Sequence, residues 1–108
     1  MSARSITIAD VRARRREILR ILAARGAVNP RVFGSVARGT ADEKSDVDLL
    51  VDVTEPRPRG FAYFGLVDSL QTDLERVLGR PVHVVLVHSV EDASSDFRRR
   101  IERDAVPL

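Results

Sequence analysis

The segment Val47–Val53, with the sequence VDLLVDV, restricts the fold of this chain more than any other feature. After Asp48 nearly every residue is apolar, which predicts a strand that is buried on both faces. With 108 residues, the chain is long enough for one compact domain and too short for two. We therefore expect residues 1–108 to form a single domain that contains this strand.

The spacing of apolar residues predicts the other elements. Helices are expected over residues 8–25, 61–78 and 90–103, a helical turn over 35–38, and strands over 31–33 and 81–87. The apolar tail 105–108 is expected to dock onto the domain. The order helix, strand, strand, helix, strand, helix predicts an α/β (α+β) fold, in which helices pack against a small mixed sheet.

Composition excludes several classes of protein. The chain contains no cysteine, which excludes disulfides and thiolate metal sites and makes a reducing cytoplasm the expected location. No apolar run approaches the roughly 20 residues that cross a bilayer, and no apolar segment of signal-peptide type follows the N-terminal arginines. We expect an ordinary globular protein with no membrane partner.

Arginine explains why the sequence pI is about 9.9 although the formal net charge is only +2. Arginines cluster in RARRR (12–16) and FRRR (97–100). Such clusters can bind nucleic acid or an acidic partner, and a solvated helix face is the simpler interpretation of each. No aromatic residues interleave the arginines, so base stacking is not indicated and nucleic acid is not the expected partner.

Two aspartates, Asp46 and Asp48, stand one residue apart where the buried strand begins. Because residues alternate between the two faces of a strand, both carboxylates point the same way and can converge on one point. Carboxylates that close together repel each other unless a proton or a cation lies between them. Mg²⁺ takes one or two carboxylates and completes its shell with phosphate oxygens and water. The pair therefore predicts a Mg²⁺ site.

Gly34 and Ser35 follow the preceding strand. A glycine lets backbone N–H groups approach a ligand closely, and a serine that opens a helical turn adds a hydroxyl and the positive end of the turn's dipole, which suit phosphate. Taken alone, the Gly34-Ser35 pair indicates a simple turn. Taken alone, the aspartate pair indicates the solvent-exposed start of a strand. Together they predict a nucleotide–metal site for phosphoryl transfer, in which positioning and charge neutralisation supply most of the catalysis.

The string GSVARGTADEKSDVDLLVDV resembles the signature of the DNA polymerase β-like nucleotidyltransferase superfamily, and in particular of its smallest members, the minimal nucleotidyltransferases. The resemblance extends through the leading and middle helices to LGRPVHVVLV and the closing IERDAVPL. It implies the nucleotidyltransferase fold, with a short mixed sheet and helices mainly on one face. It also implies that Gly34 and Ser35 hold the phosphates of the nucleotide and that Asp46 and Asp48 are catalytic and bind Mg²⁺.

The resemblance further implies a function. Minimal members of this kind are typically antitoxins encoded beside a HEPN-domain ribonuclease toxin, as in type VII-like toxin–antitoxin systems. By this resemblance the chain is a protein adenylyltransferase that transfers AMP from ATP to a tyrosine of the toxin, with Mg²⁺ as cofactor, and forms a hetero-oligomer with that toxin. Arg38, which follows the Gly-Ser pair, is expected to approach phosphate or the partner, or equally to face solvent.

One position departs from the family pattern. The superfamily carries a third carboxylate on the strand after the middle helix, and here that position is His83. A neutral imidazole can accept a proton but is a poorer Mg²⁺ ligand than a carboxylate. Asp52 shares the face of Asp48 but stands roughly 13 Å further along the strand, too far to replace the missing group. The alternative function is therefore an antitoxin that neutralises its toxin by binding alone.

A small-molecule transferase, such as one that modifies aminoglycosides, shares the same motif. Such an enzyme needs more chain to build a pocket for its acceptor, and 108 residues leave little room for one. A second subunit would have to supply that pocket. The sequence therefore favours a protein acceptor over a small molecule.

Overall fold

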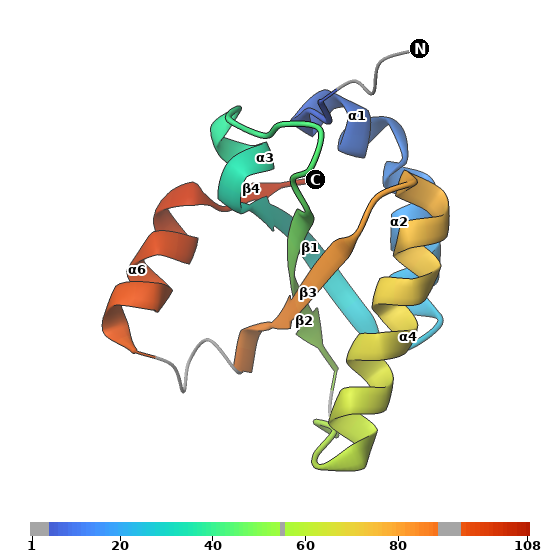
Figure 1. Cartoon of the computed structure of the whole chain (residues 1–108). Helices are drawn as coiled ribbons and strands as arrows, with labels where there is room; N and C mark the ends of the chain where they lie inside the picture. The colour runs from blue at the N-terminus through green and yellow to red at the C-terminus, as the bar shows by residue number, and fades with distance from the viewer. Residues whose placement is uncertain (1–4, 55, 89–93) are drawn as a thin grey trace.

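The structure, a computed structural model, describes residues 5–54, 56–88 and 94–108 (Figure 1). Its helices are α1 (Ile8–Ala13), α2 (Arg15–Ala23), α3 (Gly34–Arg38), α4 (Phe61–Leu78) and α6 (Ser95–Asp104). Its strands are β1 (Ala27–Phe33), β2 (Val47–Val53), β3 (Val82–Leu86) and β4 (Val106–Pro107). None of the helices in these ranges combines the length and the apolar content that a membrane span requires.

The strands form one mixed sheet in the order β3-β2-β1-β4. β1 runs antiparallel to both β2 and β4, whereas β2 and β3 run parallel. A parallel neighbour requires a long crossover connection, and α4 supplies it. The mixed sheet and the order of the elements that the sequence predicts are confirmed.

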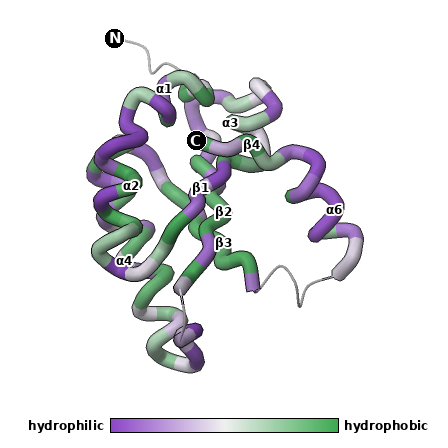
Figure 2. Tube along the Cα trace, turned by 180° about the vertical axis from the view of Figure 1, so that it is seen from behind, coloured by the Kyte–Doolittle hydropathy of each residue, from purple (hydrophilic) through white to green (hydrophobic). Residues whose placement is uncertain are grey.

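β2 lies inside the sheet and is covered on both faces. Val47, Leu49 and Val51 are fully buried in the core that α1, α2 and α4 complete. Leu50 points to the other face and packs with Ile101 of α6. Figure 1 shows α2 and α4 on one side of the sheet and α6 on the other, and Figure 2 shows that α6 is mostly hydrophilic. Most of the helices therefore cover one face, as expected.

The crossover helix α4 has the bounds that the sequence predicts. Leu70 and Leu74, one turn apart, are fully buried and carry its apolar face into the core. Gly79 follows the helix with a φ of 68°, in the left-handed region that favours glycine, and ends it.

α4 also contacts β3 through two polar side chains. Gln71 Oε1 accepts a hydrogen bond from the backbone N–H of Val84 at 3.0 Å, and Glu75 Oε1 accepts one from that of Val82 at 3.2 Å. β3 is the outermost strand on this side of the sheet, so these N–H groups face away from β2. The two side chains supply the partners that buried backbone groups need.

The helix predicted over residues 8–25 is wrong in one respect, because the structure divides it into α1 and α2. The break is at Arg14, whose φ of −104° and ψ of 14° lie outside the helical region. Its N–H bonds to the carbonyl of Val11, three residues earlier, at 3.0 Å. Neither proline nor glycine occurs near this position, so the sequence carries no local signal for the break.

The strand predicted over residues 31–33 is too short, because β1 begins at Ala27. The pairing with β2 is irregular between Val28 and Arg31. Asn29 has a φ of 57° there, and Pro30 has no N–H to donate. An Asn-Pro pair usually marks a turn, and here it lies in a bulge within the strand.

The C-terminal elements agree with expectation where they are described. Of the helix predicted over 90–103, residues 90–93 lie outside the described residues, and α6 accounts for most of the remainder. The tail docks as predicted, because β4 pairs with β1. Arg12 donates a hydrogen bond to the carbonyl of Pro107 at 2.8 Å, and Arg15 donates one to that of Leu108 at 3.0 Å. These arginines of the RARRR cluster therefore have a structural role.

Candidate active site

Gly34 and Asp48 meet where β1 ends beside the start of β2. The antiparallel register places Phe33 opposite Asp48, which brings the next residue, Gly34, against the Asp48 side chain. Gly34 has a φ of +73°, and a Cβ at this position would overlap Oδ2 of Asp48. Both the backbone conformation and the space therefore require glycine here. The sequence predicts that these residues belong to one site, and the structure brings them together.

Asp48 is half-buried on the face of the sheet that α6 covers. Its side chain is 24% exposed, and Nδ1 of His83, its neighbour on β3, lies 3.4 Å from its Oδ1. Burial raises the pKa of Asp48 above its usual value, His83 acts in the opposite direction, and the nearby negative charge of Asp46 raises it further. Asp46 itself precedes β2 and is exposed. The two carboxylates therefore interact, as their spacing predicts.

Ser35 lies in the first turn of α3, next to Gly34. Its side chain is half-buried, and its hydroxyl forms no hydrogen bond with any residue that the structure describes. The backbone carbonyl of Ser35 accepts the N–H of Thr40 at 2.9 Å, which closes the short helix. The hydroxyl is therefore available to a ligand at the edge of the sheet where Asp48 stands.

The donor set at this edge fits a hard cation and a phosphate chain. Asp46 and Asp48 would hold Mg²⁺, because that ion takes oxygen ligands and one or two carboxylates suffice when phosphates complete the shell. The space beside Gly34, which a Cβ would fill, lets the backbone approach a phosphate. No group of three or more His, Cys, Asp or Glu side chains able to hold a metal occurs in the described part of the chain. Phosphate oxygens and water would therefore have to supply the remaining ligands.

His83 stands beside Asp48 in the parallel register of β2 and β3. Its side chain is 57% exposed, so an incoming group can reach it. Asp52 lies near the far end of β2 and is used elsewhere: its carboxylate accepts hydrogen bonds from Arg31 at 2.8 Å and from Asn29 at 3.0 Å. The expectation that Asp52 cannot replace the third carboxylate is consistent with this placement.

Arg38 has a role that the sequence does not indicate. Its guanidinium donates a hydrogen bond to Oδ2 of Asp104 at 2.9 Å and so joins α3 to α6. This hydrogen bond lowers the pKa of Asp104 below its usual value. In the structure Arg38 is therefore a bridge between two helices, with half of its side chain exposed.

Arg80 also has a role that the sequence does not indicate. Its Nη1 donates to the backbone carbonyls of Asp42, Glu43 and Ser45, at distances of 3.2, 3.3 and 3.4 Å. These residues lead directly into Asp46. Arg80 therefore anchors the loop that carries the more exposed of the two site carboxylates.

Replacing Arg80 with alanine is expected to lower the nucleotide transfer that the motif predicts by about 10- to 100-fold, because small displacements of a reacting group have effects of that size. Arg76→Ala is the matched control. The Arg76 side chain is 79% exposed, and its ion pair with Asp73 is weak, because Nη1 lies 4.0 Å from Oδ1. Transfer rates of both variants, together with hydrogen exchange over residues 42–46, test this expectation. Full activity in Arg80→Ala would contradict a positioning role for Arg80.

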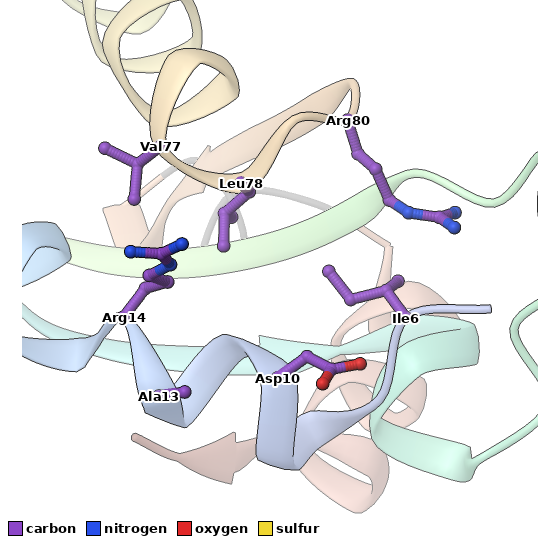
Figure 3. Close-up of a pocket in the computed structure, with 7 residues that line it drawn as sticks. All are labelled: Ile6, Asp10, Ala13, Arg14, Val77, Leu78 and Arg80. Carbon is purple, nitrogen blue, oxygen red and sulfur yellow. The ribbon is translucent and has the colours of Figure 1, made fainter. Parts of the chain in front are cut away.

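A hollow between the α1 region and the end of α4 lies away from this site. It has a volume of about 410 Å³ and is lined by residues of the α1 region and of the end of α4. Figure 3 shows Asp10 and Arg14 on one side of it and Val77, Leu78 and Arg80 on the other. Asp10 closes the capping box of α1 with Thr7. The hollow contains none of the residues that the sequence predicts for the site, so it is not the candidate active site.

The fold and the site define a nucleotidyltransferase. The family described as Nucleotidyltransferase domain matches residues 15–108, so the chain belongs to that family. A protein of Methanocaldococcus jannaschii, provisionally named a protein adenylyltransferase, is 37% identical to this chain over 94 residues, which cover 87% of this chain and 92% of the relative. Within the family the chain is a minimal nucleotidyltransferase, as its motif predicts.

Solved structures agree with this assignment. One of a provisionally named minimal nucleotidyltransferase has a TM-score of 0.73 and 39% identity, and the match covers 95% of this chain and 97% of that chain. A toxin–antitoxin crystal structure with AMP-PNP has a TM-score of 0.63 and 20% identity, over 85% of this chain and 69% of that chain. At this lower identity the likeness shows the fold alone.

Proposed function

We propose that this protein is the antitoxin of a HEPN/minimal nucleotidyltransferase pair and transfers AMP from Mg²⁺-bound ATP to a tyrosine of the partner ribonuclease toxin. The observation that carries the proposal is the contact of Gly34 with Asp48, which joins a phosphate cradle to a pair of carboxylates. The name of the M. jannaschii relative supports a protein as acceptor. A toxin–antitoxin complex with this fold supports a toxin as partner, and such a pair would act in the cytoplasm.

In this reaction the tyrosine oxygen attacks the α-phosphorus of ATP, the bond between the α- and β-phosphates breaks, and pyrophosphate leaves. Mg²⁺, when bound, neutralises the charge that develops on the phosphates. Gly34 and Ser35 would hold the phosphate chain through backbone N–H groups and the free hydroxyl. Asp46 and Asp48 would hold Mg²⁺ and so fix the position of the phosphate chain relative to β2, and water would complete the ligands of the ion.

His83 would take the proton of the tyrosine hydroxyl. Its Nδ1 is turned to Oδ1 of Asp48 at 3.4 Å, which leaves Nε2 to accept a proton. Asp48 would thereby orient the imidazole and stabilise the imidazolium that forms. In this role His83 would replace the third carboxylate that the resemblance to the superfamily implies at this position.

The intact mass of a co-purified HEPN toxin tests the proposal. After incubation with Mg²⁺ and ATP, the toxin is expected to gain one or more AMP groups, and Asp46→Asn is expected to abolish the gain. Asp68→Asn is the matched control, because Asp68 is an exposed aspartate of α4 outside the site. Loss of modification in both variants would indicate a general charge effect and contradict the role of Asp46.

A second candidate function is neutralisation by binding alone, and the histidine at position 83 is the observation that favours it. The same experiment separates the two functions. A toxin that is inhibited but keeps its mass, and remains inhibited by Asp46→Asn, would support a binding antitoxin on a nucleotidyltransferase scaffold. A toxin that is neither modified nor inhibited would contradict both.

A further inference from the structure

A small cavity lies between α3 and α6, next to the candidate active site. It has a volume of about 150 Å³, and its walls include Phe33 and Gly34 on one side and Phe97, Arg100 and Ile101 of α6 on the other. The bridge between α3 and α6 borders the same cavity and holds the two helices together. The cavity is therefore a built feature of the fold, formed where the C-terminal helix crosses the sheet.

The cavity and the proposed phosphate site share Gly34. Phe33, which lines the cavity, lies opposite Asp48 in the sheet. Leu50 follows Asp48 by two residues on β2 and therefore faces the same side of the sheet, where it packs with Phe33 and Ile101. The carboxylate and the cavity thus lie on one face. A ligand whose phosphates rest against Gly34 would extend from there into the cavity.

The walls carry an aromatic side chain and an arginine, which are groups of the kind that contact nucleobases. Phe97 is 37% exposed, on a helix that is otherwise mostly hydrophilic (Figure 2). Arg100 is exposed and forms no ion pair or hydrogen bond with any residue within the described ranges. Phe33 and Ile101 give the cavity a buried apolar floor. An aromatic ring and an unpaired guanidinium over an apolar floor suit a stacked base.

We propose that this cavity binds the base of the nucleoside triphosphate, with the base stacked on Phe97 and Arg100 in contact with the base or its ribose. The inference rests on the proposed function, because it needs the triphosphate at Gly34 and Ser35. Because α6 contributes these contacts, the protein would bind a nucleoside triphosphate more tightly than a phosphate chain that lacks the nucleoside.

Binding of Mg²⁺-ATP and of Mg²⁺-tripolyphosphate to the full chain, measured by calorimetry, tests the proposal. Phe97→Leu is expected to weaken ATP binding by about tenfold, the size that loss of one stacked base predicts, and to leave tripolyphosphate binding unchanged. Phe97→Trp is expected to retain ATP binding, because indole also stacks. Phe61→Leu is the control, since Phe61 is 96% exposed at the start of α4 and does not line the cavity.

Arg100→Gln and Arg99→Gln form a second matched pair. Both remove one positive charge from α6, but only Arg100 lines the cavity. Arg100→Gln is expected to weaken ATP binding several-fold more than Arg99→Gln does. Equal effects of the two substitutions would mean that Arg100 acts only through its positive charge, and would contradict its contact with the nucleoside.

The remaining outcomes separate this inference from the proposed function. A wild-type protein that binds ATP no better than tripolyphosphate, or a Phe97→Leu variant that binds ATP normally, would overturn the base site and leave the phosphate site intact. Equal weakening of both ligands in Phe97→Leu would also overturn it, because Phe97 would then only support the shape of the site. A wild-type protein that binds neither ligand would overturn the nucleotide site as a whole.

Discussion

Gly34→Ala is expected to abolish binding of Mg²⁺-ATP and, with it, nucleotide transfer. The added methyl group would overlap the Asp48 carboxylate, so either that side chain or the turn from β1 into α3 must move. The φ of +73° adds a backbone strain of about 1 kcal/mol. Calorimetric titration with Mg²⁺-ATP and thermal unfolding of the variant measure the two effects.

Gly39→Ala is the matched control for this substitution. Gly39 has a φ of +76°, so alanine there meets the same backbone strain, but apart from adjacent parts of the chain no heavy atom of the described residues lies within 4 Å of its Cβ position. Gly39→Ala is expected to lose about 1 kcal/mol of stability from backbone strain. Gly34→Ala is expected to lose that amount together with the cost of the overlap with Asp48, and only Gly34→Ala is expected to lose nucleotide binding. If Gly39→Ala lost binding to the same degree, strain in α3 and not the contact with Asp48 would be responsible.

Asp48→Asn is expected to abolish transfer and, in the absence of divalent cations, to stabilise the fold by about 1 kcal/mol, a typical size for a single substitution. Burial and the charge of Asp46 both disfavour the ionised form of Asp48, and they raise its pKa. The ionised form of Asp48 is therefore less favourable in the folded protein than in the unfolded chain. Asparagine removes that unfavourable interaction. Thermal unfolding in EDTA measures the gain, expected to be about 4–8 °C for a domain of this size.

The dependence of stability on pH provides a sharper test of the same residue. Because folding raises the pKa of Asp48, protonation of this carboxyl favours the folded state. Its contribution is therefore present at low pH and is lost as the pH rises through the folded-state pKa. In Asp48→Asn this contribution is expected to disappear. Added Mg²⁺ is expected to raise the unfolding temperature of the wild type and not that of Asp48→Asn, because a ligand stabilises only the state that binds it.

Asp52→Asn is the control on the same strand. Asp52 is paired with Arg31 at 2.8 Å, so its removal is expected to lower stability by up to about 1 kcal/mol and to leave transfer unchanged. A loss of stability in both variants would contradict the interpretation that the fold disfavours the ionised form of Asp48.

The elements with a strong apolar period were predicted with their correct bounds. β2 and α4 are of this kind, because one is buried on both faces and the other on a single helical face. The break at Arg14 and the early start of β1 were not predicted. The start of β1 depends on tertiary contacts, because the register with β2 extends β1 across an Asn-Pro pair that, judged locally, indicates a turn. No local residue signal marks the break at Arg14.

The candidate site was predicted in its residue types but not in its supports. The spacing of Gly34 and Asp48 indicates one site, and the register of β1 with β2 brings them into contact. Arg80 left no signal, because it acts on backbone carbonyls of a loop that is distant in sequence. The part of the cavity that Phe97 lines was also beyond prediction, since it depends on how α6 crosses the sheet.

The hydrogen bonds from β3 to Gln71 and Glu75 determine how another protein can approach this one. An open strand edge invites a foreign strand to add to the sheet, which leads to recruitment of peptides or to aggregation. Here two side chains already accept hydrogen bonds from the outward N–H groups of Val82 and Val84 in β3, and the opposite edge is the two-residue strand β4. We therefore expect a partner to recognise side chains on the faces of this molecule more readily than an edge of its sheet.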